Sequence, residues 1–96
     1  MSRMHNPVHP GEVLKDGVFN ETGITIAAFA KRIGVSRITL SRIVNGRARI
    51  TADMALRLAD ALGGSAESWI DMQARYDLWQ ARQKPRPAIK PLSLAA

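Results

Sequence analysis

The sequence lacks cysteine altogether, and aromatic residues make up only 5% of its 96 residues. Without cysteine there is no disulfide framework, no thiolate zinc site and no thiol nucleophile. Few aromatics and only 7 glycines argue against a large β-sandwich. A chain of this length supports one compact hydrophobic core. We therefore expect a small helical protein.

Long apolar runs are also missing. No stretch approaches the roughly 20 apolar residues that a membrane-spanning helix needs. The first residues, MSRMHNPVHPGE, lack the apolar core of a signal peptide. The sequence thus predicts a soluble, cytoplasmic protein without a membrane partner.

Candidates for metal binding or catalysis are few. His5 and His9 lie in a segment without helical spacing, and Glu12 is the one carboxylate near them. A metal site there would lack ligands, so we expect both histidines to be solvated. Neither has an evident acid to orient it toward a serine nucleophile. The sequence therefore predicts no enzyme, no metal site and no cofactor.

Acidic residues are absent from residues 25–50, which hold six basic ones. The net charge of +6 comes almost entirely from this window and from residues 83–96, which hold three basic residues and no acidic one. A surface that serves only solubility mixes the two signs. This segregation favours binding to a polyanion.

Helix-start and helix-stop residues divide the middle of the chain. Pro10 suits a first helical position, serines and threonines stand where the later helices begin, and glycines stand where several of them end. Residues 83–96, QKPRPAIKPLSLAA, contain three prolines and no periodicity. We expect a flexible N-terminus over 1–8, a domain over 9–82 and a basic, proline-rich tail over 83–96. The fold class is all-α, a five-helix bundle with helices at about 10–20, 26–33, 37–45, 52–62 and 66–82.

The second and third of these helices are separated by only about three residues, including a glycine. Two capped helices joined in this way are typical of a helix-turn-helix, whose second helix enters the major groove of DNA. In the helix predicted over 37–45, which is the second helix of this motif, Leu40, Ile43 and Val44 share one face, which we assign to the core. The opposite face carries Arg37, Ile38, Ser41, Arg42 and Asn45.

This outer face suits the edges of bases. Arginine pairs with the acceptors of guanine in bidentate fashion, and an aliphatic side chain packs on the methyl group of thymine. Lys31, Arg32, Arg47 and Arg49 flank the helix and are placed to meet phosphates. For Ile38 the sequence leaves a second interpretation open, in which it packs on a neighbouring helix or a partner chain or is simply an exposed apolar residue.

Residues 9–79 resemble the HigA-type antitoxins, or virulence-associated protein I family, within the XRE/Cro-like superfamily of Cro and lambda repressor. The resemblance rests on HPGEVLKD, IAAFAKRIGVSRITLSRIVNGRARIT and MALRLADALGGSAESWIDMQARYDLW and covers about 70 of the 96 residues. It implies a homodimer that binds a palindromic operator in its own promoter. It also implies a toxin partner, a ribosome-dependent enzyme that cleaves mRNA, which the antitoxin neutralises.

The resemblance also assigns residues by position. It implies base contacts by Ser36, Arg37, Ile38 and Arg42 and a backbone contact by Asn45. A polar side chain often stands where this sequence has Ile38, so the expected role of Ile38 is apolar contact. The expected contacts to the DNA backbone are Thr25, Lys31, Arg32, Ser41, Asn45, Arg47 and Arg49.

Aromatic and methionine side chains recur along the last predicted helix. Trp69, Met72, Tyr76 and Trp79 follow spacings of three, four and three, which is a heptad-like seam. We assign Trp69 to the core. Tyr76 and Trp79 suit either the core or a dimer interface.

Two other functions remain open at this point. One is an orphan transcriptional regulator of the XRE type without a toxin. The other is a protein-interaction module that keeps the helix-turn-helix as a scaffold and meets an acidic partner with its basic window. Strong salt dependence of binding would separate DNA from a protein partner.

Overall fold

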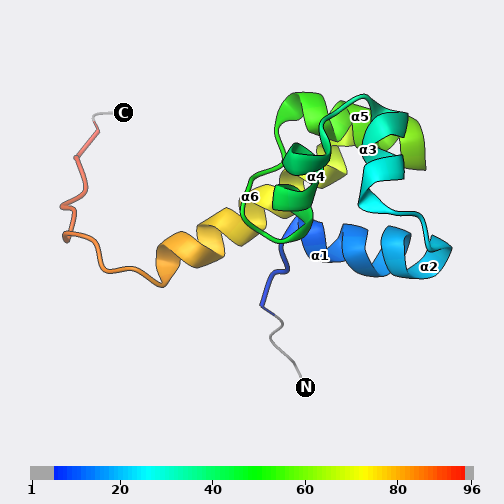
Figure 1. The fold of residues 1–96 in the computed structure, drawn as a ribbon. Coiled ribbons are helices and arrows are strands. Elements are labelled where there is room, and N and C mark those ends of the chain that lie inside the picture. The colour runs from blue at the N-terminus through cyan, green and yellow to red at the C-terminus, as the bar shows by residue number, and fades with distance from the viewer. Residues whose placement is uncertain (1–5, 95–96) are drawn as a thin grey trace, which may run out of the picture.

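A computed structural model describes residues 6–94 of the chain, and these residues form helices and no strand. The predicted all-α class is confirmed. Figure 1 shows the helices gathered into one body from which α6 and the tail project. In order they are α1 (Pro10–Leu14), η1 (Lys15–Phe19), α2 (Asn20–Thr22), α3 (Ile26–Ile33), α4 (Arg37–Val44), α5 (Ala52–Leu62) and α6 (Ala66–Arg82).

The predicted first helix over 10–20 is longer and less regular than expected. α1, η1 and α2 form one continuous helical run whose middle is a π-helix, with the N–H of Asn20 bonded to the carbonyl of Lys15. The run ends at Gly23, whose φ of 75° is in the left-handed region that favours glycine. The other four helices match the prediction, except that Asn45 caps α4 rather than extending it.

The predicted N-caps form in each case. The hydroxyl oxygens of Thr25, Ser36, Thr51 and Ser65 accept hydrogen bonds from backbone N–H groups three residues later, at 3.0–3.2 Å. Gly34 ends α3 with a φ of 76°, and Ser36 caps α4 two residues further on. Local capping chemistry therefore fixes the short joint of the helix-turn-helix.

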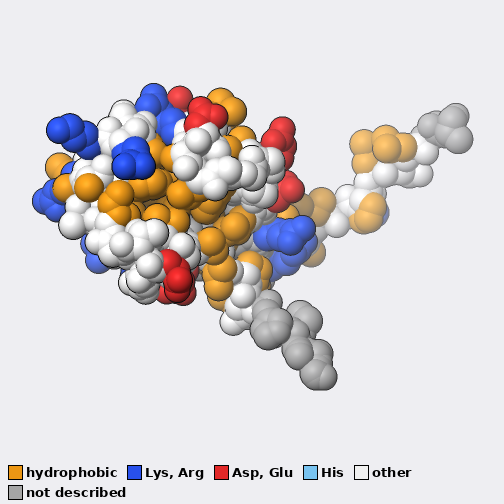
Figure 2. All heavy atoms as spheres, turned by 90° about the vertical axis from the view of Figure 1, so that its right-hand side faces the viewer, with side chains coloured by type: hydrophobic (Ala, Val, Ile, Leu, Met, Phe, Trp, Pro, Cys, Tyr) orange, Lys and Arg blue, Asp and Glu red, His pale blue; other side chains and the backbone are white. Residues whose placement is uncertain are grey.

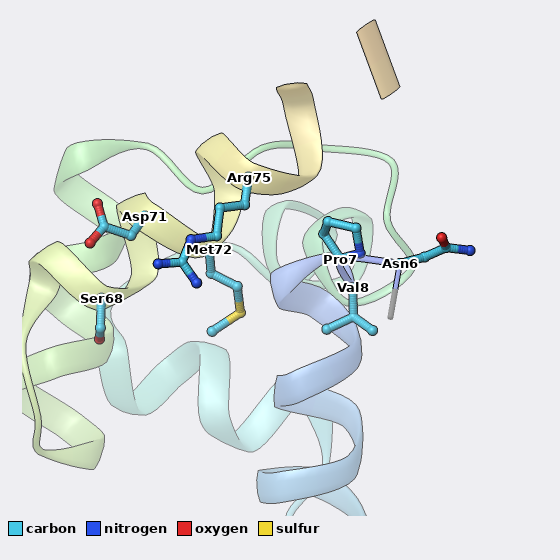
Figure 3. A pocket seen from close by; sticks show the side chains of 7 residues that line it. All are labelled: Asn6, Pro7, Val8, Ser68, Asp71, Met72 and Arg75. Atoms are coloured by element: carbon cyan, nitrogen blue, oxygen red, sulfur yellow. The ribbon is translucent and has the colours of Figure 1, made fainter. Parts of the chain in front are cut away.

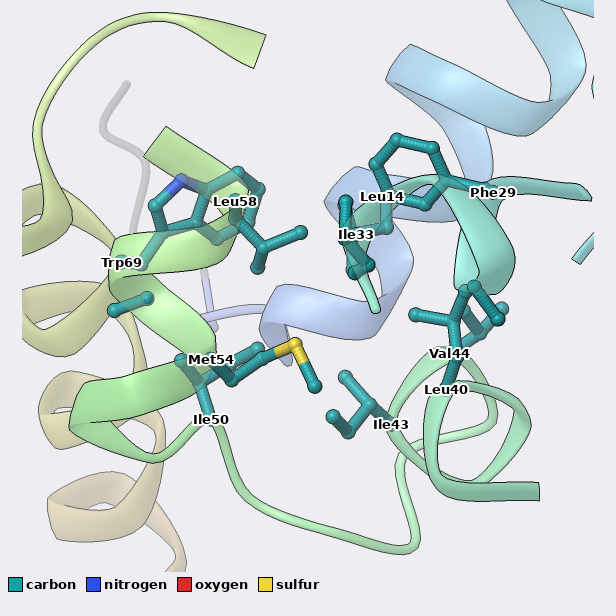
Figure 4. Packing of buried hydrophobic residues seen from close by; sticks show 12 residues of the cluster. Leu14, Phe29, Ile33, Leu40, Ile43, Val44, Ile50, Met54, Leu58 and Trp69 are labelled. Carbon is teal, nitrogen blue, oxygen red and sulfur yellow. The ribbon is translucent and has the colours of Figure 1, made fainter. Parts of the chain in front are cut away.

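One hydrophobic core joins α1, α3, α4, α5 and α6. Figure 4 shows Leu14, Leu40 and Leu58 as members of this cluster, each from a different helix, and all three are fully buried. Trp69 is only 8% exposed, which confirms its assignment to the core. Leucine packing in this core fixes how α4 is presented to solvent.

The distal half of α6 and the tail extend beyond this body (Figure 1). The radius of gyration is 16.8 Å, whereas a compact chain of this length has about 13 Å. Residues 83–94 are exposed, and no helix continues into them. None of the described helices is both long and apolar enough to cross a membrane.

Candidate nucleic-acid interface

The two faces of α4 divide as its sequence periodicity predicts. Leu40, Ile43 and Val44 are at most 4% exposed, whereas Ile38 is 69% exposed. Arg37 and Arg42 are exposed on the same outer side. Ile38 therefore packs on no neighbouring helix of its own chain, and an exposed apolar side chain stands between two cations.

Polar side chains form hydrogen bonds at both ends of α4. Ser36 accepts from the N–H of Thr39 and donates its hydroxyl to Oγ1 of Thr39 at 2.8 Å. The side-chain amide of Asn45 donates to the carbonyl of Ser41 at 2.8 Å and to its Oγ at 3.3 Å. These bonds order both ends of α4, so its outer face is presented on a rigid element.

The remaining predicted contacts lie around α4. Thr25 caps the start of α3, Lys31 and Arg32 lie in its last turn, and Arg47 follows α4, all four with exposed side chains. On the face that Figure 2 shows, most of the visible Lys and Arg side chains lie toward one edge, and the visible Asp and Glu side chains lie mostly away from it. A positive surface of this kind attracts a polyanion.

Arg49 differs from the other predicted phosphate contacts. Its Nε and Nη2 donate to Oδ2 of Asp77 on α6, at 3.0 and 2.5 Å. The pair is largely exposed, with side-chain exposures of 68% and 37%, so it contributes little to stability. It does direct Arg49 toward α6, and the structure thus separates Arg49 from the cations around α4.

Sequence reasoning missed Gln73, which holds the loop after α4. Gln73 is 2% exposed. Its Oε1 accepts from the N–H of Ile50 at 2.8 Å, and its Nε2 donates to Oδ1 of Asp77 at 3.0 Å. A glutamine on an amphipathic helix gives no sequence signal of burial, because its partner lies 23 residues away.

Arg57 was also missed, and it fixes the turn of the helix-turn-helix. Its Nη1 donates to the carbonyls of Ile33 at 2.8 Å and Gly34 at 3.3 Å, while its Nε donates to Asp53 at 2.8 Å. The last carbonyl groups of a helix have no partner within the helix and need such donors. A cation at this end also interacts favourably with the helix dipole. α5 thereby braces the joint between α3 and α4.

The chain matches the helix-turn-helix family over residues 19–69. It is 42% identical to virulence-associated protein I of Dichelobacter nodosus, covering 93% of this chain and 84% of that protein. It is also 42% identical to antitoxin HigA-1 of Vibrio cholerae, over 90% and 84% of the two chains. This chain belongs to the HigA antitoxin and virulence-associated protein I family. A solved structure of Pseudomonas aeruginosa antitoxin HigA with the higBA promoter is 40% identical, with a TM-score of 0.77 over 80% of this chain and 84% of that chain.

In this HigA-family chain, His9 is not solvated, and that expectation was wrong. It is 6% exposed. Its Nδ1 accepts from the N–H of Gly11 at 2.9 Å, which caps α1. The backbone of Ala48 lies close enough to His9 to raise its pKa. The centroids of the His9 and Tyr76 rings lie 5.0 Å apart, and the two ring planes are nearly perpendicular. His9 joins α1, the loop after α4 and α6, three elements that only the tertiary fold brings together.

Burial of His9 has a consequence for acid stability. Desolvation lowers the pKa of His9 below its usual 6.5, against opposing effects of the Ala48 backbone and of Asp77 and Glu12. The folded state thus favours neutral His9. We expect the free energy of unfolding to fall as pH drops below about 6.5 and through the folded pKa, because the unfolded chain takes up the proton first.

Denaturant titrations between pH 7.5 and 5 measure this effect. His9→Asn keeps an oxygen acceptor for the Gly11 N–H but does not titrate, so its free energy of unfolding should fall less with acid than that of the wild type. Equal pH dependence in the two proteins would show that His9 is not responsible.

Among residues 6–94, no three His, Asp or Glu side chains are grouped so as to hold a metal ion. The other candidate histidine, His5, lies outside the described residues.

Proposed function

We propose that this protein is a sequence-specific DNA-binding repressor that autoregulates its operon, and that it is the antitoxin to an mRNA-cleaving toxin. The observation that carries the DNA-binding half is the outer face of α4, where exposed Ile38 lies between exposed Arg37 and Arg42. The relative from Pseudomonas aeruginosa was solved with promoter DNA, which supports the same activity here. The proposed place of action is the cytoplasm, at the nucleoid, without a catalytic role.

In the proposed complex α4 lies in the major groove. Arg37 and Arg42 read guanine, Ile38 packs on a thymine methyl, and Ser36 contacts a base from the start of the helix. Backbone contacts come from Thr25, Lys31, Arg32, Ser41, Asn45 and Arg47. Arg49, which was predicted with them, must exchange Asp77 for a phosphate to take part.

The proposed assembly is a homodimer, since a palindromic operator needs two copies with two-fold symmetry. Its recognition helices would lie about 34 Å apart, one turn of DNA. We place the interface on the distal half of α6, at Tyr76 and Trp79. Tyr76 packs on His9, and the Trp79 ring lies 6.2 Å from that of Tyr76, so the two form a braced aromatic surface.

The antitoxin half of the proposal rests on family membership. Two relatives, each covered over more than four-fifths of its length, are antitoxins by name. The proposed toxin-binding surface has no assigned residues.

A matched pair of arginine variants tests the DNA-binding half. Arg42→Ala should cost about 1–3 kcal/mol on the operator and relax preference at one base position, because it removes a base contact. Arg47→Ala should weaken binding to all sequences alike and reduce the slope of log K against log salt by about one, because it removes a phosphate contact. Binding isotherms on operator and scrambled DNA at several salt concentrations measure both.

The same titrations test the proposal against a protein-interaction module. With six to ten phosphate contacts, wild-type affinity should fall about a thousandfold to a hundred-thousandfold between 50 and 200 mM salt. Binding that is weak at low salt, or that ignores both salt and sequence, would refute a DNA-binding function.

A further inference from the structure

An apolar groove between α5 and α6 has no occupant in the described part of the chain. It has a volume of about 270 Å³ and is lined by Leu56, Ile70 and the small residues Ala52, Ala55 and Ala66. Leu56 is 58% exposed and Ile70 38% exposed. The charged residues of its lining are Glu67 and Asp71, both acidic. The groove therefore suits a ligand that is apolar and positively charged.

The tail of the chain has that chemistry. Residues 83–94 contain Lys84, Arg86 and Lys90 and no acidic residue. Ile89, Leu92 and Leu94 are 80%, 82% and 81% exposed. Burying these aliphatic side chains lowers the free energy, because it removes apolar surface from water. The basic residues of the tail are attracted to the carboxylates at the rim of the groove. Tail and groove are thus complementary in both respects.

We propose that the tail of one copy docks in the α5–α6 groove of a second copy. This inference rests on the proposed dimer and adds an interface to it. Pro85, Pro87 and Pro91 favour extended backbone, and the tail runs away from its own body (Figure 1). Return to its own groove would require a sharp reversal just after α6, which the prolines disfavour.

A two-fold pair of antiparallel α6 helices removes the need for that reversal. Where the distal turns cross, the partner's tail leaves the end of its helix in the direction of the first copy's groove. Arg82 and Ile70 are separated by about 18 Å along one helix at 1.5 Å per residue. Ten extended residues, from 83 to Leu92, span about 33 Å. The tail is long enough to bring Ile89 and Leu92 to the groove.

A second hollow on α6 is a poorer match. Figure 3 shows it between Asn6–Val8 and α6, with Met72 and Val8 facing it. Asp71 and Arg75 both line this hollow, so its charges cancel. The basic tail gains no net attraction there, which favours the α5–α6 groove.

Because the chain has no cysteine, engineered thiols give a clean test. Leu56→Cys in one chain and Leu92→Cys in a second chain carrying a mass tag are mixed and oxidised mildly. We expect a disulfide between the two chains. The control replaces Leu56→Cys by Ala27→Cys, on the exposed side of α3, and should cross-link much less. A mixed disulfide no more abundant than that of the control would overturn the proposal.

A chain with both Leu56→Cys and Leu92→Cys separates the two possible sources of the tail. A disulfide that forms mainly within one chain, independent of protein concentration, would show that the tail binds its own groove and would overturn docking on a second copy.

Sedimentation equilibrium then tests the energetic role of the tail. Ile89→Ser with Leu92→Ser should raise the dimer dissociation constant about tenfold or more, because two aliphatic side chains lose their burial. Both residues lie outside the folded body, so the helical content should not change. A wild-type dimer that these changes leave unaltered would refute the tail contact while keeping the proposed dimer. A wild type that stays monomeric would refute both.

Discussion

Gly11→Ala is expected to destabilise the protein by more than about 3 kcal/mol. A Cβ atom at Gly11 would lie 2.0 Å from the carbonyl oxygen of Ile43 and 2.9 Å from that of Val44. These atoms belong to the backbone of α4, so the clash is relieved only by moving one helix off the other. Overpacking against side chains typically costs 1–3 kcal/mol, and a backbone contact this short should exceed that range.

Gly17→Ala is the matched control, because Gly17 lies in the same helical run. A Cβ atom there meets nothing within 4 Å, and Gly17 is not among the glycines with positive φ. This variant should gain about 0.5–1 kcal/mol, since alanine loses less backbone entropy on folding. Urea unfolding of both variants measures the difference. A Gly11→Ala loss below 1 kcal/mol would mean that α1 and α4 are not in close contact.

Leu40→Ala should lower the stability of the protein and largely spare DNA binding, whereas Ile38→Ala should weaken DNA binding and largely spare stability. Leu40 is fully buried, so its truncation leaves a cavity under α4 and should cost about 2–5 kcal/mol of unfolding free energy. Ile38 is 69% exposed, and its truncation should change stability by no more than about 0.5 kcal/mol. On the operator Ile38→Ala should instead lose about 1–2 kcal/mol, because the thymine contact disappears.

Thermal unfolding and operator titration at low temperature separate the two quantities. Leu40→Ala protein that is still folded should keep most of its affinity, since its outer face is unchanged. If Ile38→Ala bound the operator as well as the wild type, the apolar contact that we propose for Ile38 would be wrong.

The sequence was most informative where its signals are local. Thr25, Ser36 and Gly34 fix the ends of α3 and α4, because a cap acts within three residues of itself. The apolar periodicity of α4 correctly placed Leu40 inside and Ile38 outside. The segregation of charge over residues 25–50 pointed to the outer face of α4 as well, and this pattern is read without knowledge of the fold.

His9 shows where such reasoning fails. Near the N-terminus, with no helical pattern around it, a histidine is usually solvated. Its burial depends on Tyr76, 67 residues away in the sequence, and on the backbone of Ala48. Arg49 is a similar case. Its place in the sequence predicts a contact with a DNA phosphate, but in the fold it pairs with Asp77.

The sequence by itself determined the helices, the helix-turn-helix, the face of α4 turned to solvent and the sign of its charge. The tertiary structure alone decided that Gly11 touches α4, that Gln73 and His9 hold the loop after it, and that α6 projects with an open groove beside it. The physical reason is range. Caps and periodicity act over one or two helical turns. The contacts of Gly11 with α4, of Gln73 with Ile50 and of His9 with Tyr76 join residues separated by more than 20 positions and exist only once the core has packed.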